Sequence, residues 1–509
     1  MTRFRKKVLR ASPWTEYART ETGLLSYSAE ALAALEARLA GDVQQPGYPG
    51  YNDDRMVFMH TYQPYPQLII HCACETDVIA ALDFAKAQKL KVAARSGGHS
   101  TAGYSSNDQI VVDTSRIDHV LVDPVHRTAR VGAGTIFHKL NRVLDHYGLH
   151  VPGGGCETVA VAGYMQGGGY GFTSRLFGMN CDNVLSVRMV TPDGQIRRCN
   201  PEENADLYWA VRGGTGNQFG VLTEIEYRLV PLGDVWAFGL RFPLETEADR
   251  ARAARIMAQL QADYAVTGPA KMGHQAILMY LPTAAEPEGQ IAGLFLRGLY
   301  DGTEAECAAA LGPILEHVTD RETQVEIWRA GRYLDVNEAL LETADPPGQE
   351  MPNVSMNTKP LVDGRIIAET HPAERWREVI DHFLKAPDLT CFITAEFYGG
   401  AINEPLPDAM AYQHRDASLD LFSWAFWTFD THRQASTDWL DGFGRIAGAM
   451  GNGHRYQNYP RRGNPGFLRQ YFGANLDRLV EAKRRHDPEN LFEYEQSIPR
   501  EMPESEGTA

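Results

Sequence analysis

Three clusters of glycine lie in the first 220 residues, and they constrain the fold more than any other feature of the chain. The first is Gly97 and Gly98 in the stretch RSGGHSTAGYS, directly after the apolar run LKVAA. The second runs from Gly153 to Gly169, and the third is RGGTGNQFG at 212–220. Glycine allows close backbone approach and exposes N–H groups that can bind phosphate. A turn alone could explain any one cluster, but three together indicate an extended ligand with phosphates.

Charge and hydropathy exclude several classes of protein. The 509 residues carry a net charge of −16, whereas nucleic-acid binding depends on clustered Lys and Arg. No stretch approaches the ~18 consecutive apolar residues of a membrane span. The basic start of the chain is not followed by a signal-peptide apolar run, which predicts a cytoplasmic protein.

The seven cysteines do not form a recognisable framework. Their number is odd and they are scattered, so they predict no disulfide pattern and no zinc site, and we expect no metal. Cys156 is the exception, because it follows three glycines, which is a poor place for a buried structural thiol.

The apolar pattern changes near residue 233. Before it, short strands and helices alternate; residues 66–98 predict strand, helix and strand, with the helix capped by Thr76 or Asp77 and ending near Gln88. After it, helical segments alternate with strands rich in aromatic residues, which predicts helices covering one face of a sheet and leaving the other face for a ligand.

The glycine pattern does not favour a nicotinamide site. A Rossmann site needs G-x-G-x-x-G directly after the first strand and at the start of a helix. The stretch GAGTIFH at 132–138 lacks the third glycine, and GGTGNQFG comes late and leads into a strand.

Four motifs together resemble one family. They are similar to the berberine-bridge-enzyme-like branch of the vanillyl-alcohol-oxidase flavoproteins, which includes bacterial sugar, oligosaccharide and antibiotic-tailoring oxidases. The four motifs are RSGGHS, PGGGC…AGYMQGGGYGFTSRLFG, RGGTGNQFGVLTEIEYRL and RYQNYP. The resemblance implies an α+β fold: a two-part FAD-binding domain at 1–233, an antiparallel-sheet substrate domain covered by helices at 234–450, and a C-terminal segment at 451–509 that returns to the FAD-binding domain. It is weakest in the middle domain.

The resemblance also implies FAD on two covalent bonds. His99 would bond to the flavin 8α-methyl carbon and Cys156 to C6. An imidazole and a thiolate are nucleophiles suited to an electron-poor isoalloxazine. Alone, His99 would be a hydrogen-bonding turn residue; Cys156 in the same frame favours double attachment. The other residues expected at the cofactor are Arg95, Ser96, Gly97, Gly98, Ser100, Thr101, Tyr104, Gly155, Val159, Gly163, Tyr164, Gly168, Gly169, Gly171, Asn180, Gly220, Val221 and Asn458.

A second set of residues points to catalysis. The resemblance implies that Tyr170, Tyr398 and Tyr456 meet at the substrate face of the flavin. We expect Tyr456 to be the base, with Tyr398 as its hydrogen-bond partner. A phenol has a pKa near 10, so it needs help from its surroundings near neutrality. Glu396 competes for the role, because Glu396 and Tyr398 would share one face of a strand. With 22 tyrosines in the chain, each could instead be a core residue.

Two positions depend on comparison with the family pattern. Tyr164 stands where many relatives have a histidine near the flavin N1–C2=O edge, and it can donate a hydrogen bond but carries no positive charge. Val159 stands where a small residue leaves room for oxygen, and it predicts an oxidase; otherwise it is an ordinary core residue.

The leading hypothesis is an FAD-dependent oxidase. It would take a hydride from a hydroxyl-bearing or otherwise activated carbon of a sugar, oligosaccharide or secondary metabolite and reduce oxygen to hydrogen peroxide. The alternatives are a dehydrogenase with another acceptor and a flavin-loaded binding protein without turnover. The expected partners are a small-molecule substrate and oxygen, with no nucleic acid and no membrane; the oligomeric state stays open, and a monomer is compatible with the sequence.

Overall fold

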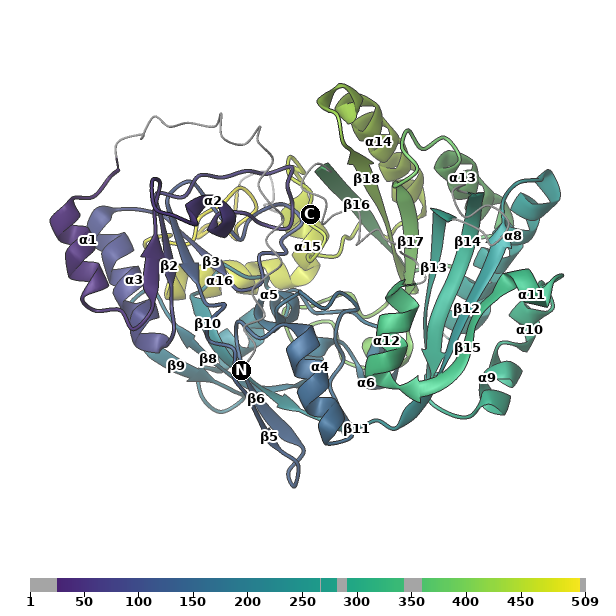
Figure 1. The fold of residues 1–509 in the computed structure, drawn as a ribbon, viewed down its shortest axis with the longest axis horizontal. Coiled ribbons are helices and arrows are strands. Elements are labelled where there is room, and N and C mark those ends of the chain that lie inside the picture. The colour runs from purple at the N-terminus through teal and green to yellow at the C-terminus, as the bar shows by residue number, and fades with distance from the viewer. Residues whose placement is uncertain (1–24, 266, 282–290, 343–358, 504–509) are drawn as a thin grey trace.

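The computed structural model describes residues 25–265, 267–281, 291–342 and 359–503. The N-terminal half contains two small sheets, and the middle of the chain forms one large sheet beside it (Figure 1). The basic N-terminal stretch, on which the cytoplasmic expectation rests, lies outside the described residues. Within the described ranges, every helix is too short or too polar to cross a bilayer.

The first small sheet has four strands, three of them parallel. Its order is β1 (Asp42–Gln44), β2 (Leu68–His71), β4 (Ile110–Asp113) and β3 (Val92–Arg95). Strands β2 and β4 are buried along their length and apolar up to their last residue, because a parallel sheet is covered on both faces. Helix α3 (Glu75–Gln88) contacts β4 of this sheet and β8 of the next.

Helix α3 ends at Gln88, as the sequence predicts, but its cap differs from the prediction. The residue at the N-cap is Cys74, and Asp77 lies inside the helix. The Asp77 carboxylate instead accepts hydrogen bonds from the backbone N–H groups of Ala40, Gly41 and Ala73. A short acidic side chain therefore joins two loops here rather than beginning the helix.

The second small sheet is antiparallel. Its strands, in order, are β5 (Val120–Asp123), β6 (Thr128–Gly132), β10 (Val221–Arg228), β8 (Val184–Val190) and β9 (Ile196–Cys199). A separate pair joins β7 (Leu149–His150) to β11 (Val230–Pro231). The other helices of this half are α1 (Ala29–Glu36), α2 (Tyr51–Asp54), α4 (Phe137–His146), α5 (Val161–Gln166), α6 (Ser174–Phe177) and α7 (Ala205–Val211).

The large sheet has seven strands, and all its pairs are antiparallel. Their order is β15 (Val325–Arg332), β12 (Asp234–Pro243), β14 (Ile291–Tyr300), β13 (Met272–Leu281), β17 (Phe392–Phe397), β18 (Leu419–Trp427) and β16 (Lys359–Ile367). The predicted two-part domain with an antiparallel-sheet domain beside it is confirmed.

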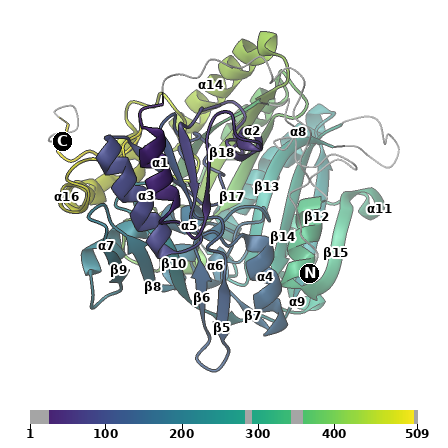
Figure 2. The ribbon, with the colours of Figure 1, turned by 60° about the vertical axis from the view of Figure 1, so that its left-hand side comes forward.

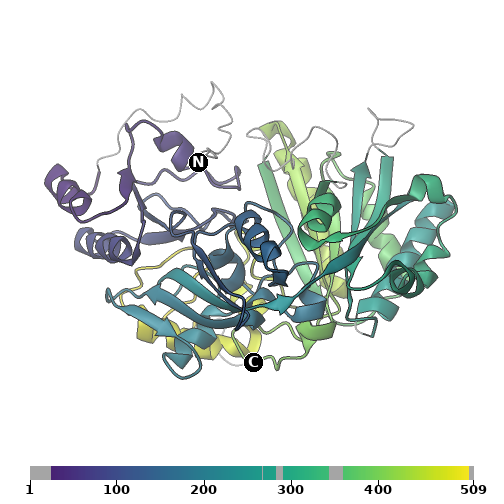
Figure 3. The same ribbon diagram turned by 60° about the horizontal axis from the view of Figure 1, so that its bottom comes forward.

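Helices cover one face of the large sheet. Long helix α14 (Arg433–Met450) buries Trp439, Leu440, Phe443 and Ala447, a stripe at helical spacing that packs on β16 and β18. The opposite face looks toward the N-terminal half (Figure 3). The remaining helices of this region are α8 (Glu247–Gln259), α9 (Glu304–Ala310), α10 (Gly312–Leu315), α11 (Arg321–Gln324), α12 (Tyr333–Glu342) and α13 (Ala373–Phe383).

Side chains alternate between these two faces along each strand. In β17, Ile393, Ala395 and Phe397 lie in the core beneath the helices. The residues between them face the other way, and among these are Thr394 and Glu396. A period of two therefore separates a packed core from a face that can meet a ligand.

The C-terminal segment packs on the N-terminal half. Helix α15 (Phe467–Phe472) precedes α16 (Leu476–His486), which lies against α7 (Figure 2). At the end of α16, Lys483 and the C-cap residue Asp487 form an ion pair at 2.7 Å with both side chains fully buried. The Lys483 ammonium also donates to the carbonyls of Gln218 and Phe492, so it links α16 to the third glycine cluster.

This ion pair gives a test of how the C-terminal segment is held. Lys483→Met leaves the Asp487 carboxylate buried without its cation, so we expect a loss of about 3–5 kcal/mol in the free energy of unfolding. The control is Glu481→Gln, which removes the exposed ion pair with Arg484 one turn away and should cost less than about 1 kcal/mol. Urea denaturation of both variants measures this, and equal midpoints would contradict the buried pair's role.

Candidate active site

One cavity of about 850 Å³ lies between the N-terminal half and the open face of the large sheet. Most of its wall comes from five places: the loop after β3, residues 154–164, residues 215–222, the open faces of strands β13, β14, β17 and β18, and the segment 456–460. All three glycine clusters predicted to meet a ligand contribute to it. The volume is in the range of cofactor and substrate sites.

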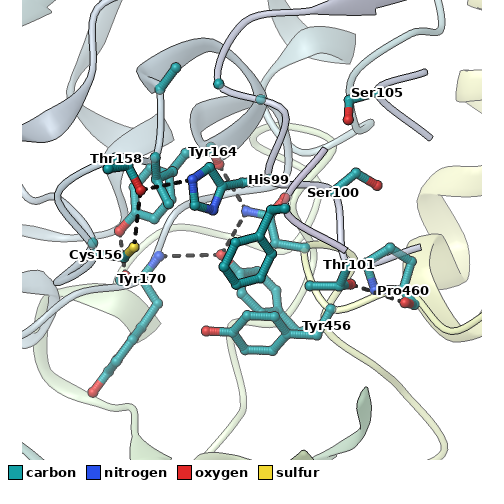
Figure 4. Close-up of a pocket in the computed structure, with 18 of the residues that line it drawn as sticks. His99, Ser100, Thr101, Ser105, Cys156, Thr158, Tyr164, Tyr170, Tyr456 and Pro460 are labelled. Carbon is teal, nitrogen blue, oxygen red and sulfur yellow. Dashed lines mark hydrogen bonds between the residues drawn. The ribbon is translucent and has the colours of Figure 1, made fainter. Parts of the chain in front are cut away.

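The predicted attachment residues lie together in this cavity. The Thr158 hydroxyl is 3.0 Å from His99 Nε2 and 3.6 Å from Cys156 Sγ, so one side chain bridges both (Figure 4). The ring of Phe58 stacks on His99 with 4.5 Å between centroids. Two nucleophiles separated by 57 residues of chain are thus presented side by side.

The first glycine pair is required by close approach. A Cβ at Gly97 would lie 2.8 Å from the backbone nitrogen of Ala160, which no side chain tolerates. Gly98 has φ of +75°, and its carbonyl accepts a hydrogen bond from the Phe58 backbone. These two glycines let the His99 loop pack directly on the segment that carries Cys156.

Donors at the cavity wall suit a polar, anionic cofactor. Arg95 Nη1, the Tyr104 hydroxyl and the Ser105 hydroxyl are buried and have no hydrogen-bond partner within the described part of the chain. Burial raises the pKa of Asp113, but Arg95 and His71 outweigh it and keep the carboxylate charged, so it holds Arg95 in place. These donors, the glycine loops and the two nucleophiles fit FAD.

Most of the predicted cofactor residues line the cavity. These are His99, Cys156, Arg95, Ser96, Gly97, Gly98, Ser100, Thr101, Tyr104, Gly155, Val159, Gly163, Tyr164, Gly171, Gly220, Val221 and Asn458. Gly168, Gly169 and Asn180 are not lining residues. Asn180 donates instead to the Pro152 carbonyl and accepts from Tyr227, which fixes the loop behind the cavity.

The Tyr456 oxygen accepts hydrogen bonds from the protein backbone. It accepts hydrogen bonds from the N–H groups of Gly169 at 2.9 Å and Tyr170 at 3.2 Å, and from the Asn458 amide at 3.0 Å. Burial raises the pKa of Tyr456. The residue lines the cavity, but its oxygen holds the second glycine cluster in place.

Tyr459, and not Tyr456, faces the Glu396 carboxylate. The Tyr459 hydroxyl donates to Glu396 Oε1 at 3.3 Å, and both residues line the cavity. The Gln275 amide also donates to Glu396 Oε1, at 3.1 Å, and Arg297 in turn donates to Gln275. Burial raises the pKa of the Glu396 carboxyl well above its ordinary value. Sequence reasoning missed Tyr459, although it lies in the motif RYQNYP that drew attention to Tyr456.

Tyr398 does not reach the cavity. It follows the last residue of β17, and its hydroxyl meets that of Tyr412 at 3.3 Å. Its ring stacks on Tyr170 with centroids 5.3 Å apart. The expected hydrogen bond between Tyr398 and Tyr456 is therefore replaced by one that Tyr398 accepts from Tyr412. Tyr170 lines the cavity and donates to backbone carbonyls.

Tyr164 and Val159 both line the cavity. The Tyr164 hydroxyl donates its hydrogen bond to the carbonyl of Tyr170, next to the second glycine cluster. Val159 is partly buried against the core of the N-terminal half, and its carbonyl accepts from the Phe137 backbone. Among the described residues, no group of His, Cys, Asp or Glu is arranged to hold a metal ion.

Two family models match the chain. One, described as an FAD binding domain, covers residues 66–200, and the other, described as berberine and berberine like, covers residues 455–499. The first includes His99 and Cys156, and the second includes Tyr456 and Tyr459. Both matched regions therefore border the same cavity.

Relatives extend the match over nearly the whole chain. An uncharacterized FAD-linked oxidoreductase, YgaK of Bacillus subtilis, is 24% identical over 91% of this chain and 98% of its own length. A carbohydrate oxidase of Microdochium nivale is 27% identical over 94% of this chain and 97% of its own. The solved structure of Physcomitrella patens BBE-like 1 has the same fold, with a TM-score of 0.82, 23% identity, and coverage of 93% of this chain and all of that one. The chain is therefore an FAD-linked oxidoreductase that carries an FAD binding domain and a berberine-like domain.

Proposed function

We propose that this oxidoreductase is an oxidase of alcohols that carries FAD on two covalent bonds, to His99 and Cys156. The observation that carries the proposal is the hydrogen bond from Tyr459 to Glu396 in the cavity that also presents the two nucleophiles. FAD, when bound, supplies a hydride acceptor at N5 and passes the electron pair to oxygen, which becomes hydrogen peroxide. The Microdochium nivale relative is named a carbohydrate oxidase, which supports an alcohol as the donor.

The base in this proposal is the Tyr459–Glu396 pair. The Tyr459 oxygen takes the proton of the substrate hydroxyl while its own proton moves to Glu396 Oε1 along the existing hydrogen bond. A phenol alone is a weak base near neutrality, whereas a carboxylate with a raised pKa lies closer to the working range. Tyr456 is less suited, because the three N–H groups that donate to its oxygen cannot receive its proton, whereas Glu396 can receive that of Tyr459.

Thr158 supports the double attachment. Its hydroxyl lies within reach of both His99 Nε2 and Cys156 Sγ, so it orients the imidazole and the thiol toward one shared space. A single bond to FAD would need only one of these groups to be oriented. The glycines beside each nucleophile leave room for a planar ring between them.

A dehydrogenase and a flavin-loaded binding protein are the two alternatives to the oxidase. A dehydrogenase would share every residue of the base and the attachment, and it differs only in its electron acceptor. A flavin-loaded binding protein has no need of a buried tyrosine hydrogen-bonded to a carboxylate, so Tyr459 and Glu396 argue against it.

The attachment is tested by acid precipitation of the purified protein. We expect the flavin to stay on the polypeptide in the native protein and in His99→Ala and Cys156→Ala, because each keeps one bond. The double variant should release its flavin. Colour that washes off the precipitated native protein would overturn the double attachment.

The base is tested by the rate of flavin reduction without oxygen. Glu396→Gln and Tyr459→Phe should each lower it by roughly 10²–10⁴, the usual worth of a general base. In the native protein the rate should rise with pH through the raised pKa of Glu396, because only the carboxylate accepts a proton; Glu396→Gln should lose this rise. Tyr398→Phe is the control, since its hydroxyl faces Tyr412. A larger loss in Tyr456→Phe than in Tyr459→Phe would return the role to Tyr456.

Oxygen as the acceptor is tested at Val159. One added methylene fills space in a close-packed wall, so Val159→Leu should slow reoxidation by oxygen at least about tenfold while leaving reduction by substrate nearly unchanged. Stopped-flow measurement separates the two half-reactions. Slow reoxidation in the native protein would favour the dehydrogenase.

A further inference from the structure

Two carboxyl groups lie side by side on the open face of the large sheet. Glu396 of β17 is directly opposite Asp420 of β18 in the antiparallel register. Along β18, Leu419 and Leu421 lie in the core beneath the helices, so Asp420 shares the open face with Glu396. Directly opposite residues have Cβ atoms about 5 Å apart, which brings the two carboxyl groups within reach of each other, directly or through one water molecule.

The two members of this carboxyl pair, Glu396 and Asp420, have different surroundings. Glu396 lines the cavity, and its Oε1 accepts from the Tyr459 hydroxyl at 3.3 Å and from the Gln275 amide at 3.1 Å. Its Oε2 is buried and has no partner among the described residues. Asp420 is fully buried behind the cavity wall, and neither of its carboxyl oxygens has a partner in the part of the chain that the structure describes.

On its other side, Asp420 meets an apolar residue and cations that are already paired. Its opposite neighbour on β16 is Ile366, which is fully buried. Arg365 and Arg455 both donate to the buried carboxylate of Asp363 instead. The two cations favour a charged Asp420, but burial outweighs them and raises the pKa of Asp420 well above its ordinary value.

The remaining titratable groups near the carboxyl pair are one arginine and five tyrosines. Arg297 of β14 favours the charged form of Glu396 and lowers its pKa. Burial raises the pKa of every one of the tyrosines, so they stay neutral and add no charge to the pair. They are Tyr164, Tyr170, Tyr398, Tyr456 and Tyr459.

The hydrogen bonds decide which member of the pair is charged. Two buried carboxyl groups this close cannot both be ionised, because the like charges repel and neither is solvated, so the pair keeps one proton. Donors to a carboxylate favour its charged form, and among the described residues only Glu396 receives them, from Tyr459 and Gln275. The charge therefore belongs on Glu396 and the proton on Asp420. Glu396 Oε2 is the acceptor left for that proton.

We propose that Asp420 is a positioning residue for the base: it carries the one proton of the carboxyl pair, directs it toward Glu396 Oε2, and so keeps Glu396 charged and able to accept a proton at Oε1. When Tyr459 passes its proton to Oε1 and takes that of the substrate hydroxyl, both carboxyl groups become neutral. The proposal rests on the proposed function, since it concerns the same base.

Infrared difference spectroscopy of the flavin-loaded protein locates the proton. The C=O stretch of a neutral carboxyl lies at higher frequency than the stretches of a carboxylate, and at about pH 8 ordinary carboxyl groups are charged. We expect Asp420→Asn to remove one neutral-carboxyl band, because the amide keeps the shape and can still donate to Glu396. Glu396→Gln should keep that band and remove a carboxylate.

Two results would overturn the proposal. One is loss of the neutral-carboxyl band in Glu396→Gln, which would place the proton on Glu396. The other is a band that neither variant changes, which would mean that the pair holds no proton. If Asp420→Asn does not fold, Glu396→Gln still decides through the first result.

Urea unfolding at several pH values supplies a second measurement. Asp420 is charged in the unfolded chain but neutral in the folded protein, so its contribution to stability is lost as pH rises toward its raised pKa. Between about pH 6 and 8, the unfolding equilibrium constant of the native protein should rise about tenfold per pH unit relative to that of Asp420→Asn. An equal pH dependence of the two proteins would contradict a neutral Asp420.

Asp430→Asn is the matched control for unfolding. Asp430 lies just beyond β18, is exposed and pairs with Lys359 at 2.6 Å. Lys359 lowers the pKa of Asp430, so its carboxyl is charged in the folded and the unfolded protein, and this variant should keep the native pH dependence. Neither measurement needs a substrate, so a protein that oxidises no alcohol would overturn the proposed function without changing these spectra. A pH dependence in Asp430→Asn like that of Asp420→Asn would overturn the assignment to Asp420.

Discussion

The alternation of side chains in the seven-stranded sheet is the constraint on which the site depends. One face of β13, β17 and β18 packs in a core beneath α13 and α14. Among the residues of these three strands, only those on the other face can therefore contact a ligand. A register shift of one residue would bury Glu396 in that core and expose Phe397. Packing on one side of the sheet thus holds the Glu396 carboxylate on the other.

In the N-terminal half, loops that are distant in the sequence are held close together. Gly97 allows backbone contact with Ala160, and the Tyr456 oxygen ties the second glycine cluster to a segment 286 residues further along the chain. The buried pair of Lys483 and Asp487 holds the C-terminal segment against the third cluster. Buried polar groups, which would destabilise the fold if they were unpaired, link these loops through their hydrogen bonds.

The sequence was informative where the chemistry is local. The glycine clusters and the frame of His99 and Cys156 predicted one cavity wall, and the aromatic strands predicted a sheet with one free face. Tyr398 was predicted to meet Tyr456, but the structure places its hydroxyl elsewhere: β17 ends at Phe397, and the Tyr398 oxygen accepts a hydrogen bond from Tyr412. The choice between Tyr456 and Tyr459 needed contacts with Gly169 and Glu396, which are remote in sequence and which no spacing rule predicts.

Peptide mapping by mass spectrometry is the sharpest test of double attachment, because it reports both proposed attachment sites in one molecule. After denaturation and digestion with trypsin, we expect a single flavin-bearing species that joins the peptide containing His99 to the peptide containing Cys156. Recovery of both peptides without flavin would contradict a cavity that binds one cofactor from two sides.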